Sequence, residues 1–264
     1  MANPDPGFRS EVPAGMEQGG GPRIVAVVPA LNEALSIEQV VRGLLDQALV
    51  PLAEVLVVDN GSRDGTGQIA RAAGASVVTE PRRGYGYACR AGVLAAVGAD
   101  IVVLLDGDAA DDPDDLPRVL QPLLRGQADL VVGSRSLGAC EPGSMTPHQV
   151  FGNWLAATIM RTLYGVAVTD LGPFRAIRRD ALLAMGMREM TYGWSVEMMV
   201  KAARAGLHYR EVPVSYRRRA GGVSKVAGTI GGSARAGWCI ISTTVRYWRW
   251  TPPRPAAAEL AASR

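Results

Sequence analysis

The stretch Ile101-Val-Val-Leu-Leu-Asp-Gly-Asp108 joins a continuous apolar run to two aspartates. A run of five apolar residues is typical of a strand buried on both faces, and such strands belong to parallel sheets covered by helices. Ligands of these sheets bind just beyond the carboxyl ends of the strands. Asp106 and Asp108 therefore fall where a functional site is expected, and two carboxylates at this spacing can share one hard cation that also bridges diphosphate oxygens.

The flanking sequence repeats this alternation of apolar runs and helical patterns. The predicted strands are 24–28, 55–58, 76–79, 101–105 and 129–132, and the predicted helices are 36–47, 66–73, 84–97 and 113–125. This succession predicts an α/β fold with a doubly wound, mostly parallel sheet flanked by helices.

The second half of the chain carries fewer strand patterns. The predicted elements are a helix near 149–164, a short strand near 173–177, a helix over 194–205 and a strand over 208–216. Residues 217–225 combine three arginines, two glycines and a lysine, which predicts a mobile basic loop. A last helix is expected to reach about Trp250.

Composition and charge exclude several classes of protein. The chain has 264 residues, 48% hydrophobic and 20% charged, which is typical of a soluble globular protein with a large core. A net charge of +3 gives no electrostatic argument for a nucleic-acid partner. The 3 cysteines have no short paired spacing, which argues against a disulfide framework or a zinc cluster and fits a reducing cytoplasm.

Residues 1–22 are expected to be a disordered tail, 23–250 a single domain and 251–264 a flexible tail. We find no apolar stretch of the roughly twenty residues that cross a bilayer. An aromatic and basic end either lies at a lipid headgroup interface or caps the core, and it comprises Arg246, Tyr247, Trp248, Arg249 and Trp250.

Other strand ends also carry candidate residues. Asp59 ends the second predicted strand, where a carboxylate can accept from a nucleobase or ribose, or simply form the following turn. Arg83 lies in a basic turn before a predicted helix whose glycines permit close approach to the backbone, as in anion sites at helix N-termini, although a solvated turn is the alternative. The acids between Asp111 and Asp115 are explained by the dipole of the helix that they precede.

Two common nucleotide-binding classes are disfavoured, because no Gly-x-Gly-x-x-Gly follows the first strand and no Walker lysine motif occurs.

Taken together, these segments resemble glycosyltransferase family 2, and within it most closely the dolichyl-phosphate mannose synthase-like group. The resemblance covers about residues 23–229. The motifs occur in this order: Val-Pro-Ala-Leu-Asn-Glu33, Val-Val-Asp-Asn-Gly-Ser-Arg-Asp-Gly-Thr-Gly67, Asp106-Gly-Asp108, Asp114-Asp-Leu-Pro117, Val-Val-Gly-Ser-Arg135, Asp170-Leu-Gly-Pro-Phe-Arg-Ala176, Glu197, Val212-Pro-Val, Tyr216-Arg-Arg-Arg and Gly222-Val-Ser-Lys225. The resemblance implies a GT-A fold (the nucleotide-diphospho-sugar transferase fold), a nucleotide-sugar donor, Mg²⁺ or Mn²⁺ as cofactor, and inversion at the anomeric carbon.

The resemblance also implies roles for individual residues. Residues 23–135 would bind the nucleotide sugar, and 136–250, with the mobile loop 217–225, the acceptor. The nucleotide-sugar site would comprise Pro29, Asn32, Glu33, Asp59, Arg83, Asp106, Arg217 and Lys225, with Asp106 and Asp108 as metal ligands. Arg135 suits an acceptor phosphate, and Trp194 could wall an acceptor pocket. An acceptor hydroxyl would need a general base, for which Glu197 is the first candidate and Asp170 the second.

Three departures from the family pattern qualify these roles. Asn60 stands where a second aspartate is usual, which leaves the choice between UDP- and GDP-hexose open. The Gln-x-x-Arg-Trp signature of processive members is missing, so one sugar is expected per turnover. We also see no transmembrane anchor after the catalytic domain, which predicts a cytoplasmic protein, with peripheral contact at the inner face of the cell membrane as an extension.

The leading hypothesis is a metal-dependent inverting glycosyltransferase that moves one hexose to a polyprenyl phosphate. The alternative keeps the donor and uses a soluble hydroxyl acceptor, such as a small metabolite or natural product. A sugar nucleotidyltransferase is a distant alternative, because the first strand is not followed by a basic triphosphate loop. A catalytically silent nucleotide-binding protein would not need Asp106 and Asp108 together with the loop cations. The sequence does not indicate the oligomeric state.

Overall fold

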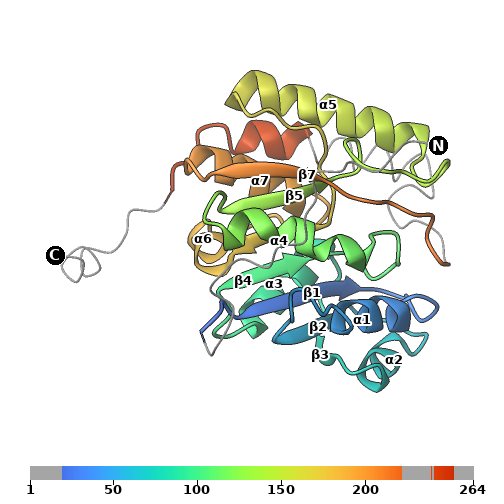
Figure 1. Cartoon of the computed structure of the whole chain (residues 1–264). Coiled ribbons are helices and arrows are strands. Elements are labelled where there is room, and N and C mark those ends of the chain that lie inside the picture. The colour runs from blue at the N-terminus through green and yellow to red at the C-terminus, as the bar shows by residue number, and fades with distance from the viewer. Residues whose placement is uncertain (1–19, 222–238, 240, 253–264) are drawn as a thin grey trace, which may run out of the picture.

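One seven-stranded sheet organises the molecule, a computed structural model that describes residues 20–221, 239 and 241–252. The strand order is β3-β2-β1-β4-β6-β5-β7, with helices on both faces (Figure 1). The strands are β1 (Ile24–Ala30), β2 (Glu54–Asp59), β3 (Ser76–Thr79), β4 (Ile101–Leu104), β5 (Leu130–Ser134), β6 (Arg175–Arg178) and β7 (Tyr209–Pro213). Only β6 runs against its neighbours among these strands, so the predicted mostly parallel sheet is confirmed.

The helices follow the predicted pattern closely. They are α1 (Ile37–Leu45), α2 (Thr66–Ala72), α3 (Tyr85–Ala95), the 3-10 turn η1 (Pro113–Asp115), α4 (Leu116–Leu124), α5 (Pro147–Tyr164), α6 (Arg179–Ala184) and α7 (Trp194–Arg204). Residues 241–246 are also helical, within the predicted last helix. Helix α6 was not predicted from the sequence, because six residues are too few to show an amphipathic period.

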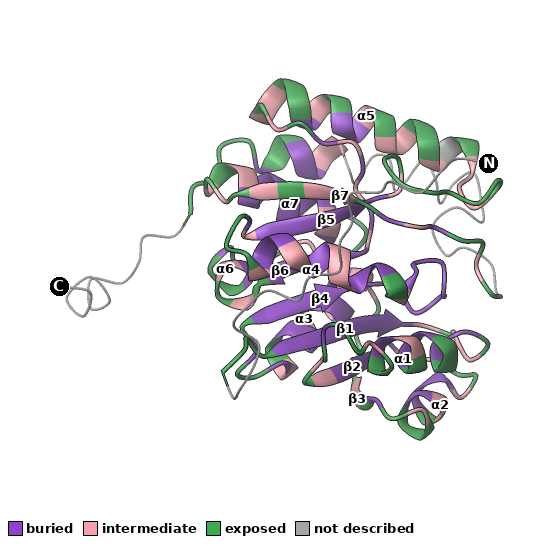
Figure 2. Cartoon of the chain, in the orientation of Figure 1, coloured by how far each residue is buried: buried purple, intermediate pink, exposed green. Residues whose placement is uncertain are grey.

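Alternating residues of the strands build two hydrophobic layers. Val25 and Val27 of β1 face a layer with α3, α5 and α7, whereas Ile24 and Ala26 face α1, α2 and α4. The strands are therefore buried on both faces, while the outer surfaces of the helices are exposed (Figure 2). This explains why the strands read as continuous apolar runs.

One edge of the sheet collects the carboxyl ends of the strands that carry the candidate residues. In the strand register Ala30 lies opposite Asp59, and Asp59 opposite Thr79. Because β4 and β5 are both antiparallel to β6, they run in the same direction. Asp106 and Arg135, which follow these two strands, therefore leave the sheet at the same edge as Asp59.

The aromatic end of the chain caps the core through two of its three rings. The rings of Tyr247 and Trp250 lie 4.7 and 5.1 Å from the buried Nζ of Lys201, whereas Trp248 is exposed. None of the helices in the described part of the chain is both long and apolar enough to cross a membrane.

Candidate active site

Three carboxylates meet beyond the end of β4. Asp108 and Asp111 are buried, and Asp106 is partly buried. Ala109 has a φ of 60°, in the left-handed region that residues with a side chain rarely adopt, and this turn returns the chain toward β4. The backbone N–H of Asp106 donates to Asp111 Oδ2 at 3.4 Å. Assigning Asp111 to the helix dipole was therefore wrong: it belongs to the carboxylate cluster, defined here as Asp106, Asp108 and Asp111.

Burial and mutual repulsion dominate the electrostatics of the carboxylate cluster. Burial raises the pKa of Asp106 to about 7, and the charge of Asp108 adds to this shift. Burial, together with the charges of Asp106 and Asp108, also raises the pKa of Asp111. Among the described residues, one oxygen of each carboxylate is buried without a hydrogen-bond partner: Asp106 Oδ1, Asp108 Oδ2 and Asp111 Oδ1. Such oxygens are costly unless a cation satisfies them, so the carboxylate cluster is suited to bind one.

The next aspartates in the chain have the predicted structural role. Asp112 is the N-cap of η1 and accepts from the backbone N–H of Asp114 at 3.3 Å. Asp115 accepts from Arg118 Nη1 at 2.6 Å. These carboxylates support the start of α4 and are separate in function from the carboxylate cluster.

The predicted nucleoside residues lie together at the ends of β1 and β2. The N–H of Asn32 donates to Ser62 Oγ at 2.9 Å, and Asp59 Oδ1 accepts from the N–H of Ser62 at 2.8 Å. The N–H of Glu33 donates to Thr66 Oγ1 at 2.9 Å. Pro29 is buried at the end of β1. These bonds tie the two loops together, which brings all four predicted residues to one edge.

A hydroxyl group links this nucleoside region to the carboxylate cluster. Ser36, which precedes α1, donates through Oγ to the carbonyl of Gly107 at 2.8 Å. Gly107 lies between Asp106 and Asp108, so the start of α1 positions the turn that carries both carboxylates.

Asn60 has a structural role in the following turn. Its Nδ2 donates to the carbonyls of Glu80 and Arg82 at 2.8 and 2.7 Å, and its Oδ1 accepts from the N–H of Gly84 at 2.9 Å. An aspartate could not donate either of the first two bonds. Asparagine at this position is therefore explained by the turn itself, without reference to a nucleotide base.

The glycines at the start of α3 are approached by the protein's own backbone. A side chain at Gly84 would collide with the carbonyl of Met190, and one at Gly86 with that of Glu189. The prediction that these glycines leave the backbone open to a ligand was therefore wrong. Arg83 is exposed, and its Nη2 donates to the carbonyl of Gly61 at 3.0 Å, next to the nucleoside region.

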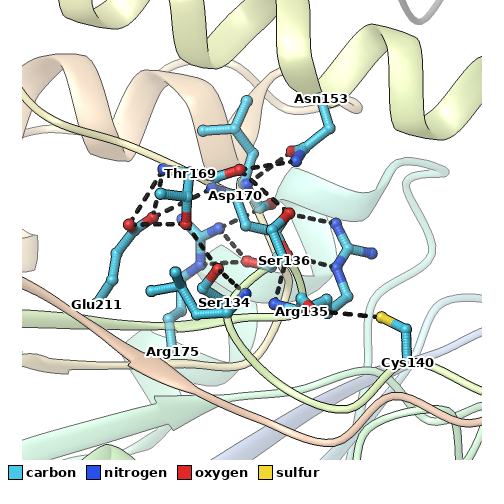
Figure 3. Close-up of polar contacts among 12 residues, drawn as sticks. Ser134, Arg135, Ser136, Cys140, Asn153, Thr169, Asp170, Arg175 and Glu211 are labelled. Atoms are coloured by element: carbon cyan, nitrogen blue, oxygen red, sulfur yellow. Dashed lines mark hydrogen bonds and ion pairs between the residues drawn. The ribbon is translucent and has the colours of Figure 1, made fainter.

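Arg135, directly after β5, is clamped by a buried carboxylate (Figure 3). Its Nε and Nη2 donate to Oδ2 and Oδ1 of Asp170, each at 2.7 Å, and its backbone N–H donates to Oδ2 at 2.7 Å. The guanidinium carbon lies 4.9 Å from the ring centre of Tyr216. Arg135 also lowers the pKa of Asp106, though less than burial and Asp108 raise it. The arginine is therefore fixed within electrostatic reach of the carboxylate cluster.

Two residues that the sequence analysis missed hold the turn that carries Asp170. Glu211 of β7 accepts from the N–H groups of Thr169 and Asp170 at 2.9 and 3.1 Å. Asn153 of α5 donates to the carbonyl of Thr169 at 3.1 Å and accepts from the N–H of Leu171 at 2.9 Å. Nothing in the local sequence marks either residue, because both act on a segment that is distant in the chain.

Glu197, the first candidate for a general base, is fully buried and fully paired. Its carboxylate accepts from the N–H groups of Arg188 and Glu189, with the shortest contacts at 2.9 and 2.6 Å, and pairs with Lys201 Nζ at 2.7 Å. These bonds hold the 188–190 segment against the start of α3. Trp194 is 2% exposed in the core, so the prediction that it walls an acceptor pocket was wrong.

The basic segment after β7 lies against the carboxylates. Arg217 pairs with Asp112, and Arg219 Nη2 lies 2.8 Å from Asp108 Oδ2. We had not singled out Arg219, since three consecutive arginines give no local signal for which one faces inward. Lys225, the other predicted diphosphate ligand, lies outside the described residues.

Comparisons with known proteins identify the family to which this chain is similar. Residues 25–186 match the family described as glycosyl transferase family 2. An uncharacterized glycosyltransferase of Mycobacterium tuberculosis is 40% identical over 84% of this chain and 99% of its own length. The undecaprenyl-phosphate mannosyltransferase of Micrococcus luteus is 34% identical over 80% of this chain and 90% of its own. Glucosyl-3-phosphoglycerate synthase from M. tuberculosis, solved with Mn²⁺, UDP and phosphoglyceric acid, is 26% identical with a TM-score of 0.71, covering 89% of this chain and 81% of that chain.

Proposed function

Because the chain belongs to glycosyltransferase family 2 and is a glycosyltransferase, we propose that it moves one hexose, with inversion, from a nucleoside-diphosphate sugar to a polyprenyl phosphate. The family, the GT-A fold and the class of enzyme predicted from the sequence are confirmed by the comparisons.

The carboxylate cluster supports a divalent metal on the donor side. Asp106 and Asp108 would hold Mg²⁺ or Mn²⁺, with the unsatisfied oxygen of Asp111 adding negative charge. In the described part of the chain no three acidic, histidine or cysteine side chains form a complete metal site. That fits an ion whose remaining ligands are diphosphate oxygens, as is usual for metals in phosphate sites. When bound, the ion neutralises charge that develops on the leaving diphosphate.

The proposal of a phosphate acceptor rests on the observation that both candidate bases are already bound to other groups of the protein. Glu197 accepts from two backbone N–H groups and a buried lysine, and both oxygens of Asp170 are used by Arg135. A hydroxyl acceptor needs a base to remove its proton, whereas a phosphate oxygen is already a nucleophile. Because both candidate bases are occupied and Arg135 is held in a fixed orientation, a phosphate acceptor is favoured, and Arg135 would bind it through its remaining N–H groups on Nη1 and Nη2.

An exposed aromatic face on α5 supports a lipid as the carrier of that phosphate. Val150, Phe151 and Trp154 are 53%, 61% and 59% exposed, and the two rings lie 5.8 Å apart between their centres. Asn153, which lies between the two aromatic residues on this helix, binds the Asp170 turn, so the same helix carries the exposed face and supports the partner of the acceptor arginine. We propose that this face contacts the inner surface of the cell membrane.

A second candidate acceptor is a small soluble molecule. The solved synthase was crystallised with phosphoglyceric acid, and its similarity to this chain favours testing acceptors of that kind. Such a molecule also carries a phosphate that Arg135 could bind, but its acceptor hydroxyl would still need a base.

An acceptor panel tests the proposal. Purified protein is incubated with UDP- and GDP-hexoses, with Mn²⁺ or Mg²⁺, and with either a polyprenyl phosphate in detergent or phosphoglyceric acid. We expect metal-dependent transfer to the polyprenyl phosphate. Transfer only to phosphoglyceric acid or to another hydroxyl compound would overturn the lipid proposal and leave the family assignment intact.

A further inference from the structure

Arg219 contacts Asp108, one of the two carboxylates that would hold the metal. Its Nη2 lies 2.8 Å from Asp108 Oδ2, while Asp108 Oδ1 accepts from the N–H of Ala110 at 2.9 Å. Oδ1 thus has a hydrogen-bond partner, whereas Oδ2 makes an ion-pair contact with Arg219 and has no hydrogen-bond partner among the described residues. A cation that binds at Oδ2 meets the guanidinium there, and the guanidinium, on a side chain 27% exposed, is easier to displace than the backbone N–H on Oδ1 inside a tight turn.

The backbone of the same segment is aligned with the turn that carries the carboxylates. The N–H of Arg217 donates to the carbonyl of Ala110 at 2.8 Å, and that of Ala220 to the carbonyl of Asp108 at 3.3 Å. A side chain at Gly221 would collide with Leu35, which lies two residues after Glu33 of the nucleoside region. Residues 217–221 therefore extend from the carboxylate cluster to the nucleoside region. Within this segment, Arg219 is the residue whose side chain contacts Asp108.

We propose that Arg219 is the counter-ion of Asp108 in the metal-free protein, and that a divalent cation and Arg219 exclude each other at this carboxylate. Two positive charges cannot share one carboxylate oxygen without strong repulsion. Metal binding thus displaces the Arg219 side chain from Asp108, which couples the position of this side chain to the presence of the metal. This inference rests on the proposed function, because it requires the carboxylate cluster to be a metal site.

Mn²⁺ binding to the full chain without nucleotide tests the proposal. The EPR signal of free Mn²⁺ reports the dissociation constant, and activity is not needed. Arg219→Gln removes the competing charge, so it should bind Mn²⁺ about fivefold more tightly than the wild type, the equivalent of a partly exposed ion pair. Arg219→Lys keeps a cation and should stay close to the wild type.

Arg218→Gln is the matched control, because it removes the same charge one residue away. Arg218 binds the carbonyl of Pro142 and pairs with Glu141, so its loss should leave Mn²⁺ affinity within twofold of the wild type. Equal or weaker Mn²⁺ binding by Arg219→Gln would overturn the inference, and so would equal tightening by both variants. If no protein binds Mn²⁺ even with UDP, the proposed metal site fails and the inference with it.

Discussion

Arg135 and Asp170 form a two-point ion pair, with Nε and Nη2 of the arginine each 2.7 Å from a carboxylate oxygen. Asp170 is fully buried and the side chain of Arg135 is 11% exposed, so the pair is shielded from water. A carboxylate held in this way orients a guanidinium better than it accepts a substrate proton. We therefore propose that Asp170 is a positioning residue for Arg135.

Replacing Asp170 by Asn should weaken acceptor binding more than donor binding. An amide has only one oxygen, so the two-point pair becomes a single bond and the guanidinium loses its fixed orientation. We expect the acceptor KM to rise about tenfold or more, with UDP affinity within twofold of the wild type. Asp129→Asn, which weakens an exposed pair with Arg178, should change neither constant. Equal losses of donor and acceptor binding in Asp170→Asn would argue against this role.

Changing Asp108 to Asn should abolish metal-dependent binding of UDP while the protein remains folded. The amide keeps an acceptor for the N–H of Ala110 but loses the charge that attracts a divalent cation. Calorimetric titration with UDP and Mn²⁺ measures the effect. Asp114→Asn is the control, because Asp114 belongs to the same acidic run and accepts from Gln47. Undiminished UDP affinity in Asp108→Asn would defeat the metal assignment.

The role of Glu197 can be separated from its effect on stability by a second substitution. Glu197→Gln leaves the ammonium of Lys201 buried without its carboxylate, which should cost about 3–5 kcal/mol of unfolding free energy. Adding Lys201→Met removes that unpaired charge, so the double variant should recover much of the stability, measured by urea unfolding, and turn over at near wild-type rate. A double variant that is stable but still slower by about 10²–10⁴ would show that Glu197 is a general base.

The stability contributed by Glu80 should depend on pH. Arg82 binds both oxygens of this carboxylate at 2.8 and 2.7 Å, and this hydrogen bonding lowers the pKa of Glu80 from 4.5 to about 2. Because the folded pKa lies below the unfolded one, the stabilisation is present above pH 4.5 and is lost as the pH falls toward 2. Glu80→Gln should therefore lower the Tm at neutral pH, and by less below pH 4.5. A difference in Tm that is constant with pH would contradict this assignment.

Replacing both Phe151 and Trp154 by Ser should reduce membrane binding without changing the active site. Both side chains are exposed on α5, so their loss should cost little stability. We expect weaker sedimentation with anionic phospholipid vesicles and a higher KM for polyprenyl phosphate in vesicles, with UDP affinity unchanged. Trp248→Ser tests an exposed aromatic ring in the C-terminal segment, and it should have the smaller effect. The reverse order would move the membrane contact to the C-terminal segment.

Local patterns in the sequence determined the class of sheet, most element positions and the place of Asp106 and Asp108. Apolar runs, caps and turn residues act within a few positions of one another, so their effect is readable along the chain. The direction of β6 was not readable, because four residues of strand pattern carry no direction. Its antiparallel pairing with β4 and β5 depends on the path of the preceding connection.

Only the tertiary structure decided which charged groups are paired and which are available. Three acidic residues illustrate this difference. One oxygen of Asp111 has no partner among the described residues, whereas Asp170 and Glu197 are held in buried ion pairs. Arg219, in turn, reaches Asp108 from a distant strand end. The chemistry of a carboxylate depends on its burial and on the charges beside it, and segments far apart in the chain supply both.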